Sequence, residues 1–226
     1  MNFIKKHLDI LIFIVLEVCL YTSFLTLDFI DTTISNYIKY ASIIICLLMS
    51  LYIAIRKKGE FCSVFTSFGL LFTVISDYFL LLNHDNNLFI IGVFTFFVGQ
   101  VFYFIMLLKR RNFSHLYFDL GIRIILTLII IFVSLGIKLD TLTTLALIYF
   151  VELFANFVSS LTLIKRDKKV VFLSLGLFLF ILCDINVALN NLRIESSTLR
   201  FVVFYLMWLF YLPSQVIISI NSYFLE

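Results

Sequence analysis

The chain has 226 residues, of which 62% are hydrophobic and 14% charged, and its mean hydropathy is +1.11. Soluble domains contain about 45–50% apolar and about 25% charged residues, so this composition excludes a soluble globular protein. The net charge of +3 comes from short clusters in separate segments. These clusters form no continuous basic face, so nucleic-acid binding is not indicated.

Eight apolar runs are long enough to cross a membrane, for which a helix needs about 20 residues at about 1.5 Å each. In chain order they are Leu8–Leu27, Tyr37–Ile55, Phe61–Leu82, Leu88–Leu108, Leu116–Leu135, Thr141–Ile164, Val170–Leu189 and Leu199–Ile220. The segments between them are short. We therefore expect one all-α integral membrane domain over residues 1–226, a polytopic bundle of eight transmembrane helices.

The positive charges predict how this bundle is oriented. Twelve of the 17 Lys and Arg residues precede the first run or lie in alternate loops, in the clusters Lys5–Lys6, Arg56–Lys58, Lys109–Arg111 and Lys165–Lys169. The other face has four, which are Lys39, Lys138, Arg193 and Arg200. Because cytoplasmic loops carry an excess of Lys and Arg, we expect both termini in the cytoplasm, with the protein in a bacterial plasma membrane.

The third and seventh runs repeat each other. GLLFTVISDYFLLLN (residues 69–83) and GLFLFILCDINVALN (residues 176–190) align without a gap at a constant offset of 107 residues, the separation of Asp77 and Asp184. An offset of four helices preserves direction. The repeat therefore predicts two parallel four-helix halves, residues 1–112 and 113–226, related by an axis along the membrane normal.

The two repeated aspartates are the candidate catalytic residues. Asp77 and Asp184 lie five or six residues before the outer ends of their predicted helices, roughly 8–9 Å deep at about 1.5 Å per residue. An acidic side chain at this depth must face a partner or an interior cavity. Two of them at equal depth are expected to share one cavity and one proton, which supplies an acid and a base at neutral pH.

Other polar residues recur at helical spacing and can converge on the same interior face. The candidate substrate-binding residues are Gln100, Tyr103, Tyr149, Glu152, Asn156, Asn186, Tyr211 and Gln215. The alternative for residues such as Gln100, Asn156 and Gln215 is that they hydrogen-bond one helix to another, as polar residues commonly do in membranes. For the aspartates this alternative is weaker, because such bonds need no ionisable group.

Asp119, Arg123 and Glu17 are further charged residues inside apolar runs. Asp119 and Arg123 are four residues apart on the fifth run, which predicts a structural ion pair. Glu17, in the middle of the first run, has no local partner, and its role stays open.

The cysteines, histidines and sequence motifs present limit the reactions that this protein could catalyse. The four cysteines, Cys19, Cys46, Cys62 and Cys183, form no CxxC motif, and the three histidines lie in separate segments. This pattern predicts neither a disulfide nor a metal site, and the chain has no GxSxG, HExxH or phosphate-binding glycine loop. We expect no cofactor. Carboxylate acid/base chemistry or a transport pathway remains.

Several short motifs in order resemble the YhhN-like lysoplasmalogenase family. They are Ser76-Asp77, FIIGVFTFFVGQVFYF (residues 89–104), Cys183-Asp184 and FYLPSQVIISI (residues 210–220). The resemblance implies an eight-helix membrane fold that hydrolyses the vinyl ether bond of lysoplasmalogens, releasing a fatty aldehyde and a glycerophospho-base. Asp77 and Asp184 match the family's two motif aspartates. The sequence departs from the pattern at Ser76, where glycine is usual, and at Gln100, where histidine is common.

Two functions are thus compatible with the sequence. The first is a hydrolase that acts on a single-chain phospholipid with paired aspartates and no metal. The alternative is a transporter or lipid-binding protein that uses the same acidic cavity between its two halves. The sequence leaves the headgroup, the chain length and the oligomeric state open.

Overall fold

The computed structural model describes residues 7–83, 86–110, 113–191 and 196–224. They form α2 (Leu8–Leu27), α3 (Thr32–Arg56), α4 (Phe61–Asp77), the π-helical turn η1 (Tyr78–Leu82), α5 (Asn86–Leu108), α6 (Phe113–Ile137), α7 (Thr141–Ile164), the 3-10 turn η2 (Lys168–Val170), α8 (Val171–Asn191) and α9 (Ser197–Phe224). Eight helices in this part of the chain are long and apolar enough to span a membrane. The predicted all-α bundle of eight transmembrane helices is confirmed.

The predicted limits hold for α2 and α7, whereas other helices are longer than predicted. The clearest case is α3, which begins at Thr32 and not at Tyr37. The carboxylate of Asp31 accepts hydrogen bonds from the backbone N–H groups of Thr33 and Ile34, at 2.8 and 3.2 Å. This N-cap satisfies donors of the first turn and extends the helix beyond its apolar run.

The third span covers the predicted residues but changes geometry within them. It is α-helical from Phe61 to Asp77 and π-helical from Tyr78 to Leu82. π-Helical turns are rare and occur frequently at functional sites. Asp77 is therefore the last α-helical residue before a local widening of the helix.

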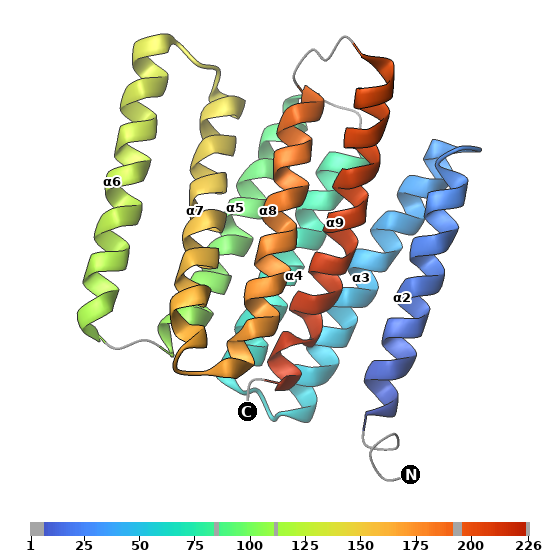
Figure 1. Ribbon diagram of the computed structural model, residues 1–226, viewed down its shortest axis with the longest axis horizontal. Helices are drawn as coiled ribbons and strands as arrows, with labels where there is room; N and C mark the ends of the chain where they lie inside the picture. Colours follow the sequence, from blue (N-terminus) through green and yellow to red (C-terminus); the bar gives the residue numbers. More distant parts are fainter. Residues whose placement is uncertain (1–6, 84–85, 111–112, 192–195, 225–226) are drawn as a thin grey trace.

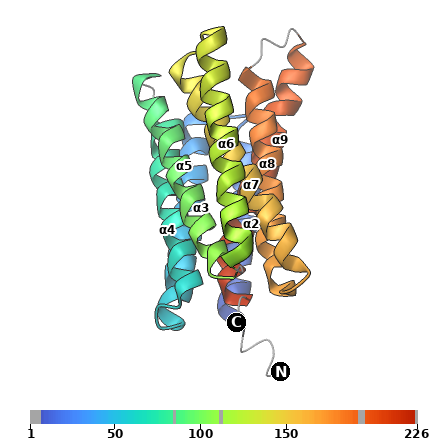
Figure 2. The same ribbon diagram turned by 90° about the vertical axis from the view of Figure 1, so that its left-hand side faces the viewer.

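Six of the helices form a closed ring. Each packs on the next in the order α3, α4, α5, α7, α8, α9 and back to α3, and α4 also contacts α9 across the interior. α2 packs outside the ring against α3 and α9, and α6 packs outside it against α7. These two helices lie at opposite edges of the bundle, and the view turned by 90° shows α6 in front of the ring (Figures 1 and 2).

The helices of the two predicted halves follow the same order around the ring. α3, α4 and α5 occupy one part of the ring, and α7, α8 and α9 occupy the other. The outlying α2 and α6 are the first helices of their halves. The division at residues 112 and 113 nevertheless stays a prediction.

The repeated glycines allow close helix packing in both parts of the ring. A Cβ atom on Gly69 would lie 2.2 Å from the ring of Tyr103 on α5, and one on Gly176 would lie 2.7 Å from Ile218 on α9. Small residues let helix backbones approach closely in membranes. The two glycines thus hold α4 against α5 and α8 against α9.

The outer surface of the bundle is apolar, while many polar side chains point inward. On α6, for example, Phe132 is 80% exposed and Leu135 is 74% exposed. Buried polar residues include Ser76, Gln100, Asn156 and Gln215. This arrangement suits a lipid solvent, in which polar groups need internal partners.

The start of α2 and the end of α9 lie at the same end of the bundle (Figure 1), and we call the opposite end the distal end. The basic cluster Arg56–Lys58 lies at the non-distal end, because it joins α3 to α4. Lys5, Lys6, Arg111 and Arg193, which were part of the charge count, lie outside the described residues. The orientation of the bundle in the membrane stays a prediction.

Candidate active site

Asp77 is buried at the end of α4 and has one hydrogen-bond donor from α9. Asp77 is only 3% exposed, and the hydroxyl of Tyr211 donates a hydrogen bond to its Oδ2 at 2.6 Å. The donor reaches Asp77 because α4 and α9 touch across the ring. Asp77 therefore faces the interior of the bundle, away from lipid.

Asp184 has a matching partner from α7. The hydroxyl of Tyr149 donates to its Oδ2 at 2.7 Å, and Asp184 itself is half-buried. Each predicted catalytic carboxyl group is thus bound by the phenol of a predicted substrate-binding tyrosine. A hydrogen bond of this kind fixes the orientation of the carboxyl group and leaves its other oxygen available for chemistry.

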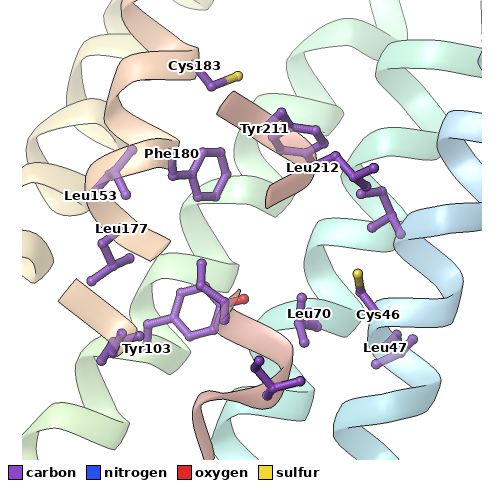
Figure 3. Close-up of a cluster of buried hydrophobic side chains, with 14 of the residues drawn as sticks. Cys46, Leu47, Leu70, Tyr103, Leu153, Leu177, Phe180, Cys183, Tyr211 and Leu212 are labelled. Atoms are coloured by element: carbon purple, nitrogen blue, oxygen red, sulfur yellow. The ribbon is translucent and has the colours of Figure 1, made fainter. Parts of the chain in front are cut away.

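One aromatic cluster joins the two Tyr–Asp pairs. The ring of Phe96 stacks on Tyr149 with centroids 5.7 Å apart and meets Tyr211 edge-on at 6.4 Å. Phe180 lies edge-on to both Phe96 and Tyr211, at 5.7 and 5.5 Å. Figure 3 shows Phe180 and Tyr211 side by side, from α8 and α9. We call Phe96, Tyr149, Phe180 and Tyr211 the aromatic cluster.

Both carboxyl groups are linked to the same aromatic ring. Tyr149, which binds Asp184, and Tyr211, which binds Asp77, both contact Phe96. Cys183 is 5% exposed and lies at the edge of the buried cluster drawn in Figure 3. The geometry therefore places the two carboxyl groups around one region of the interior, with aromatic rings between them.

Gln100 and Asn156 bind each other. The Asn156 side-chain N–H₂ donates to the backbone oxygen of Gln100 at 2.9 Å and to its Oε1 at 3.1 Å. Both residues are almost completely buried. These contacts link α5 to α7 and match the second interpretation of such residues, a hydrogen bond between helices.

Three other candidate residues are buried in different surroundings. Tyr103 packs over Gly69, and Asn186 donates to the carbonyl of Leu182 on its own helix at 2.7 Å. Gln215 is fully buried on α9, one helical turn beyond Tyr211. Among these three, no hydrogen bond to Asp77 or Asp184 occurs within the described residues.

Glu152 belongs to a separate ionic cluster on α6 and α7. The predicted pair of Asp119 and Arg123 is present, with 3.4 Å between Oδ2 and Nε. Arg123 also binds the carboxylate of Glu152, donates to Ser159 at 3.2 Å, and lies 4.0 Å from the ring centroid of Phe104. Glu152, predicted to bind substrate, thus has a structural partner that the sequence spacing did not reveal.

Glu17 and Lys39 have partners that the sequence did not reveal. Glu17 has no partner on its own helix, but Ser42 and Cys46 of α3 donate to its carboxylate. Lys39, counted with the charges of the outer face, is 1% exposed and paired with Asp28. A lysine two residues after the expected helix start gave no signal of this burial, because its partner lies just beyond the end of another helix.

The described residues contain no group of three or more His, Cys, Asp or Glu side chains placed to hold a metal ion. The chemical groups of the site are two carboxyl groups, two phenols and an aromatic lining. Such a set can donate a proton, accept a proton, and stabilise a positive charge between the carboxylates and the ring faces.

The fold and the site together define an integral membrane protein of eight apolar helices with a pair of interior aspartates. The model of the YhhN family matches residues 35–221, from the start of α3 almost to the end of α9. The chain belongs to the YhhN family. Comparison with curated proteins and with solved structures gave no match.

Proposed function

We propose that this protein is a membrane hydrolase that cleaves the vinyl ether bond of lysoplasmalogens. The observation that carries the proposal is the pair of interior carboxyl groups, each bound by one tyrosine and both bordering one aromatic cluster. Membership of the YhhN family is consistent with this reaction. The products are a fatty aldehyde and a glycerophospho-base.

The reaction needs one acid and one base. The acid forms a C–H bond at the vinyl carbon farther from the ether oxygen, and the other vinyl carbon becomes part of an oxocarbenium ion. Water adds to that carbon and gives a proton to the second carboxylate. The protonated base then gives its proton to the glycerol oxygen as that C–O bond breaks, and the hemiacetal hydroxyl gives its proton to the carboxylate that acted as the acid. One water molecule is consumed, and both carboxyl groups return to their initial states.

The difference in burial suggests which aspartate does which task. Asp77, at 3% exposure, is the more enclosed residue and is assigned the role of proton donor. Asp184 is less enclosed and is assigned the role of base. The division of labour resembles that of the two carboxyl groups of glycosidases, where a cationic intermediate of the same type forms.

The aromatic cluster supports the same reaction. The faces of Phe96 and Tyr149 carry partial negative charge and stabilise a nearby cation, in addition to the carboxylate. The apolar lining also limits the number of water molecules near the intermediate. The substrate is a single-chain phospholipid whose chain lies among apolar helices while its headgroup stays near the distal end.

The test is aldehyde release by purified protein in detergent, where transport has no meaning. We expect release from a lysoplasmalogen and none from the alkyl ether analogue of the same headgroup and chain length, because a saturated ether has no carbon to protonate. The Asp77→Asn variant, checked for folding, is the control. Absence of aldehyde with folded wild-type protein would contradict the hydrolase and leave transport or lipid binding as the function.

We further propose that both termini face the cytoplasm of a bacterial cell and that the distal end faces outward. The basic cluster Arg56–Lys58 and the pair Arg110–Asp167 lie at the end that this orientation assigns to the cytoplasm. Reporter proteins fused after Glu226 should be active only if they function in the cytoplasm. Activity of an exported reporter at that position would reverse the orientation and place the site in the other leaflet.

A further inference from the structure

Lys39 is a fully buried cation in a membrane-spanning helix. Lys39 is only 1% exposed, and its Nζ lies 2.6 Å from Oδ1 of Asp28, the residue that follows α2. The hydroxyl of Ser35 donates to the same Oδ1 at 2.5 Å. A buried ion pair is costly to form in a membrane and is usually kept for a function, so its surroundings are informative.

Three aromatic rings surround the Lys39 ammonium. Its Nζ lies 4.3 Å from the ring centroid of Trp208, 5.3 Å from that of Phe204 and 5.4 Å from that of Phe24. All three distances are within the range of cation–π attraction, which is strongest for tryptophan. The shortest contact thus holds Trp208 of α9 against Lys39 of α3.

Trp208 connects this cation to the candidate active site. The Trp208 ring meets Tyr211 edge-on, with centroids 5.7 Å apart, and Tyr211 donates its hydrogen bond to Asp77. Trp208 and Tyr211 lie one helical turn apart on α9. A continuous series of contacts therefore runs from Asp28 through Lys39, Trp208 and Tyr211 to Asp77.

We propose that Lys39 is a positioning residue for the reaction, which fixes Trp208 and thereby holds the Tyr211 hydroxyl on the Asp77 carboxyl group. This inference rests on the proposed function. Lys39 itself does not touch the reacting atoms. Its ammonium sets the place of the Trp208 ring, and that ring limits the positions that Tyr211 can adopt.

The first experiment removes the cation without leaving a buried carboxylate unpaired. The neutralised-pair variant, Asp28→Asn/Lys39→Met, should lower kcat by about three- to tenfold, no more than the loss of the Tyr211 hydroxyl itself, with KM changed less than about twofold. The single variant Lys39→Arg should keep most of the wild-type kcat, because a guanidinium can also bind Asp28 and the face of the Trp208 ring. The control, Arg110→Met/Asp167→Asn, removes an ion pair at the non-distal end and should keep wild-type kcat.

A double-mutant cycle tests whether Lys39 acts through Tyr211. In a Tyr211→Phe background the neutralised pair should lower kcat by less than about threefold, since the hydrogen bond that Lys39 supports is already gone. If the losses of kcat caused by the neutralised pair and by Tyr211→Phe multiply in the combined variant, the proposal is overturned. A raised KM with unchanged kcat would also overturn it, because Lys39 would then bind substrate directly.

Trp208 fluorescence gives a measurement that does not depend on turnover. Trp208 is the one tryptophan of the chain, so its emission reports this contact alone. The neutralised pair should shift the emission, and Lys39→Arg should not. Unchanged emission would show that Lys39 does not order Trp208, whatever the activity. If the wild-type protein releases no aldehyde, the hydrolase proposal fails, and the emission still decides whether Lys39 holds Trp208.

Discussion

Asp77 and Asp184 occupy equivalent positions in a repeated sequence, but the two regions that hold them differ. α4 ends at Asp77 and continues as the π-helical turn Tyr78–Leu82, whereas α8 stays α-helical from Val171 past Asp184 to Asn191. Asp77 is 3% exposed and Asp184 is half-buried. A duplicated motif thus gives two aspartates in different local surroundings, and such a difference can separate an acid from a base.

The hydrogen-bond donors break the symmetry further. Asp184 receives its bond from Tyr149 on the neighbouring helix of the same predicted half. Asp77 receives its bond from Tyr211, across the ring and from the other half. The buried aspartate therefore depends on how the two halves are assembled, while the half-buried one depends on packing within a single half.

The largest effects should come from the aspartates themselves. Asp77→Asn should lower turnover by about three orders of magnitude, because no other group protonates the vinyl carbon, and Asp184→Asn by about two orders, because water can still react slowly without a base. Turnover of folded variants on a lysoplasmalogen is the measurement. The reverse order of the two effects would exchange the roles assigned here.

The tyrosines should matter less than the aspartates and unequally. Tyr211→Phe removes the donor to the more enclosed Asp77 and should lower kcat by about tenfold, whereas Tyr149→Phe should lower it by about threefold, since Asp184 is the less enclosed residue. Parallel kcat measurements on the two variants make the comparison. Equal losses would show that the difference in exposure has no catalytic consequence.

The two glycines of the repeat should differ in stability. Gly69→Ala places a methyl group 2.2 Å from a rigid aromatic ring, while Gly176→Ala places one 2.7 Å from Cγ1 of the aliphatic Ile218 side chain. Overpacking typically costs about 1–3 kcal/mol, and we expect the upper part of this range at Gly69 and the lower part at Gly176. Thermal unfolding in detergent measures both. A more stable Gly69→Ala than Gly176→Ala would contradict the packing described.

The smallest effect should follow the loss of the bond between α5 and α7. Gln100→Ala removes the side-chain acceptor of Asn156 but leaves the backbone acceptor in place. Hydrogen bonds between membrane helices average about 0.6 kcal/mol, so a small loss of stability is expected with turnover within about threefold of wild type. A loss of turnover as large as that of Tyr211→Phe would return Gln100 to the substrate-binding residues.

Much of the fold followed from the sequence, because apolar runs of membrane length and tight loops leave few alternatives. The positions of Asp77 and Asp184 in the interior also followed, since a repeated acidic residue in a membrane helix needs an interior partner. Spacing along one helix predicted the pair of Asp119 and Arg123 correctly.

Contacts between helices distant in the sequence could not be predicted in this way. Helical spacing indicates which residues share a face but not which face of another helix meets them. Glu152 binds Arg123 of α6, and Lys39 binds Asp28 beyond the end of α2. The π-helical turn after Asp77 had no signal either, because GLLFTVISDYFLLLN and its α-helical counterpart have similar apolar patterns.

The most direct test of the shared site is the turnover of the Asp77→Asn/Asp184→Asn double variant beside the two single variants. Residues that act as one catalytic unit are strongly non-additive, so the double variant should be no more than about threefold slower than the slower single variant. The folded state of each protein is checked by thermal unfolding. Losses that multiply in the double variant, or full activity in either single variant, would contradict the account of two aspartates that act as one acid/base pair.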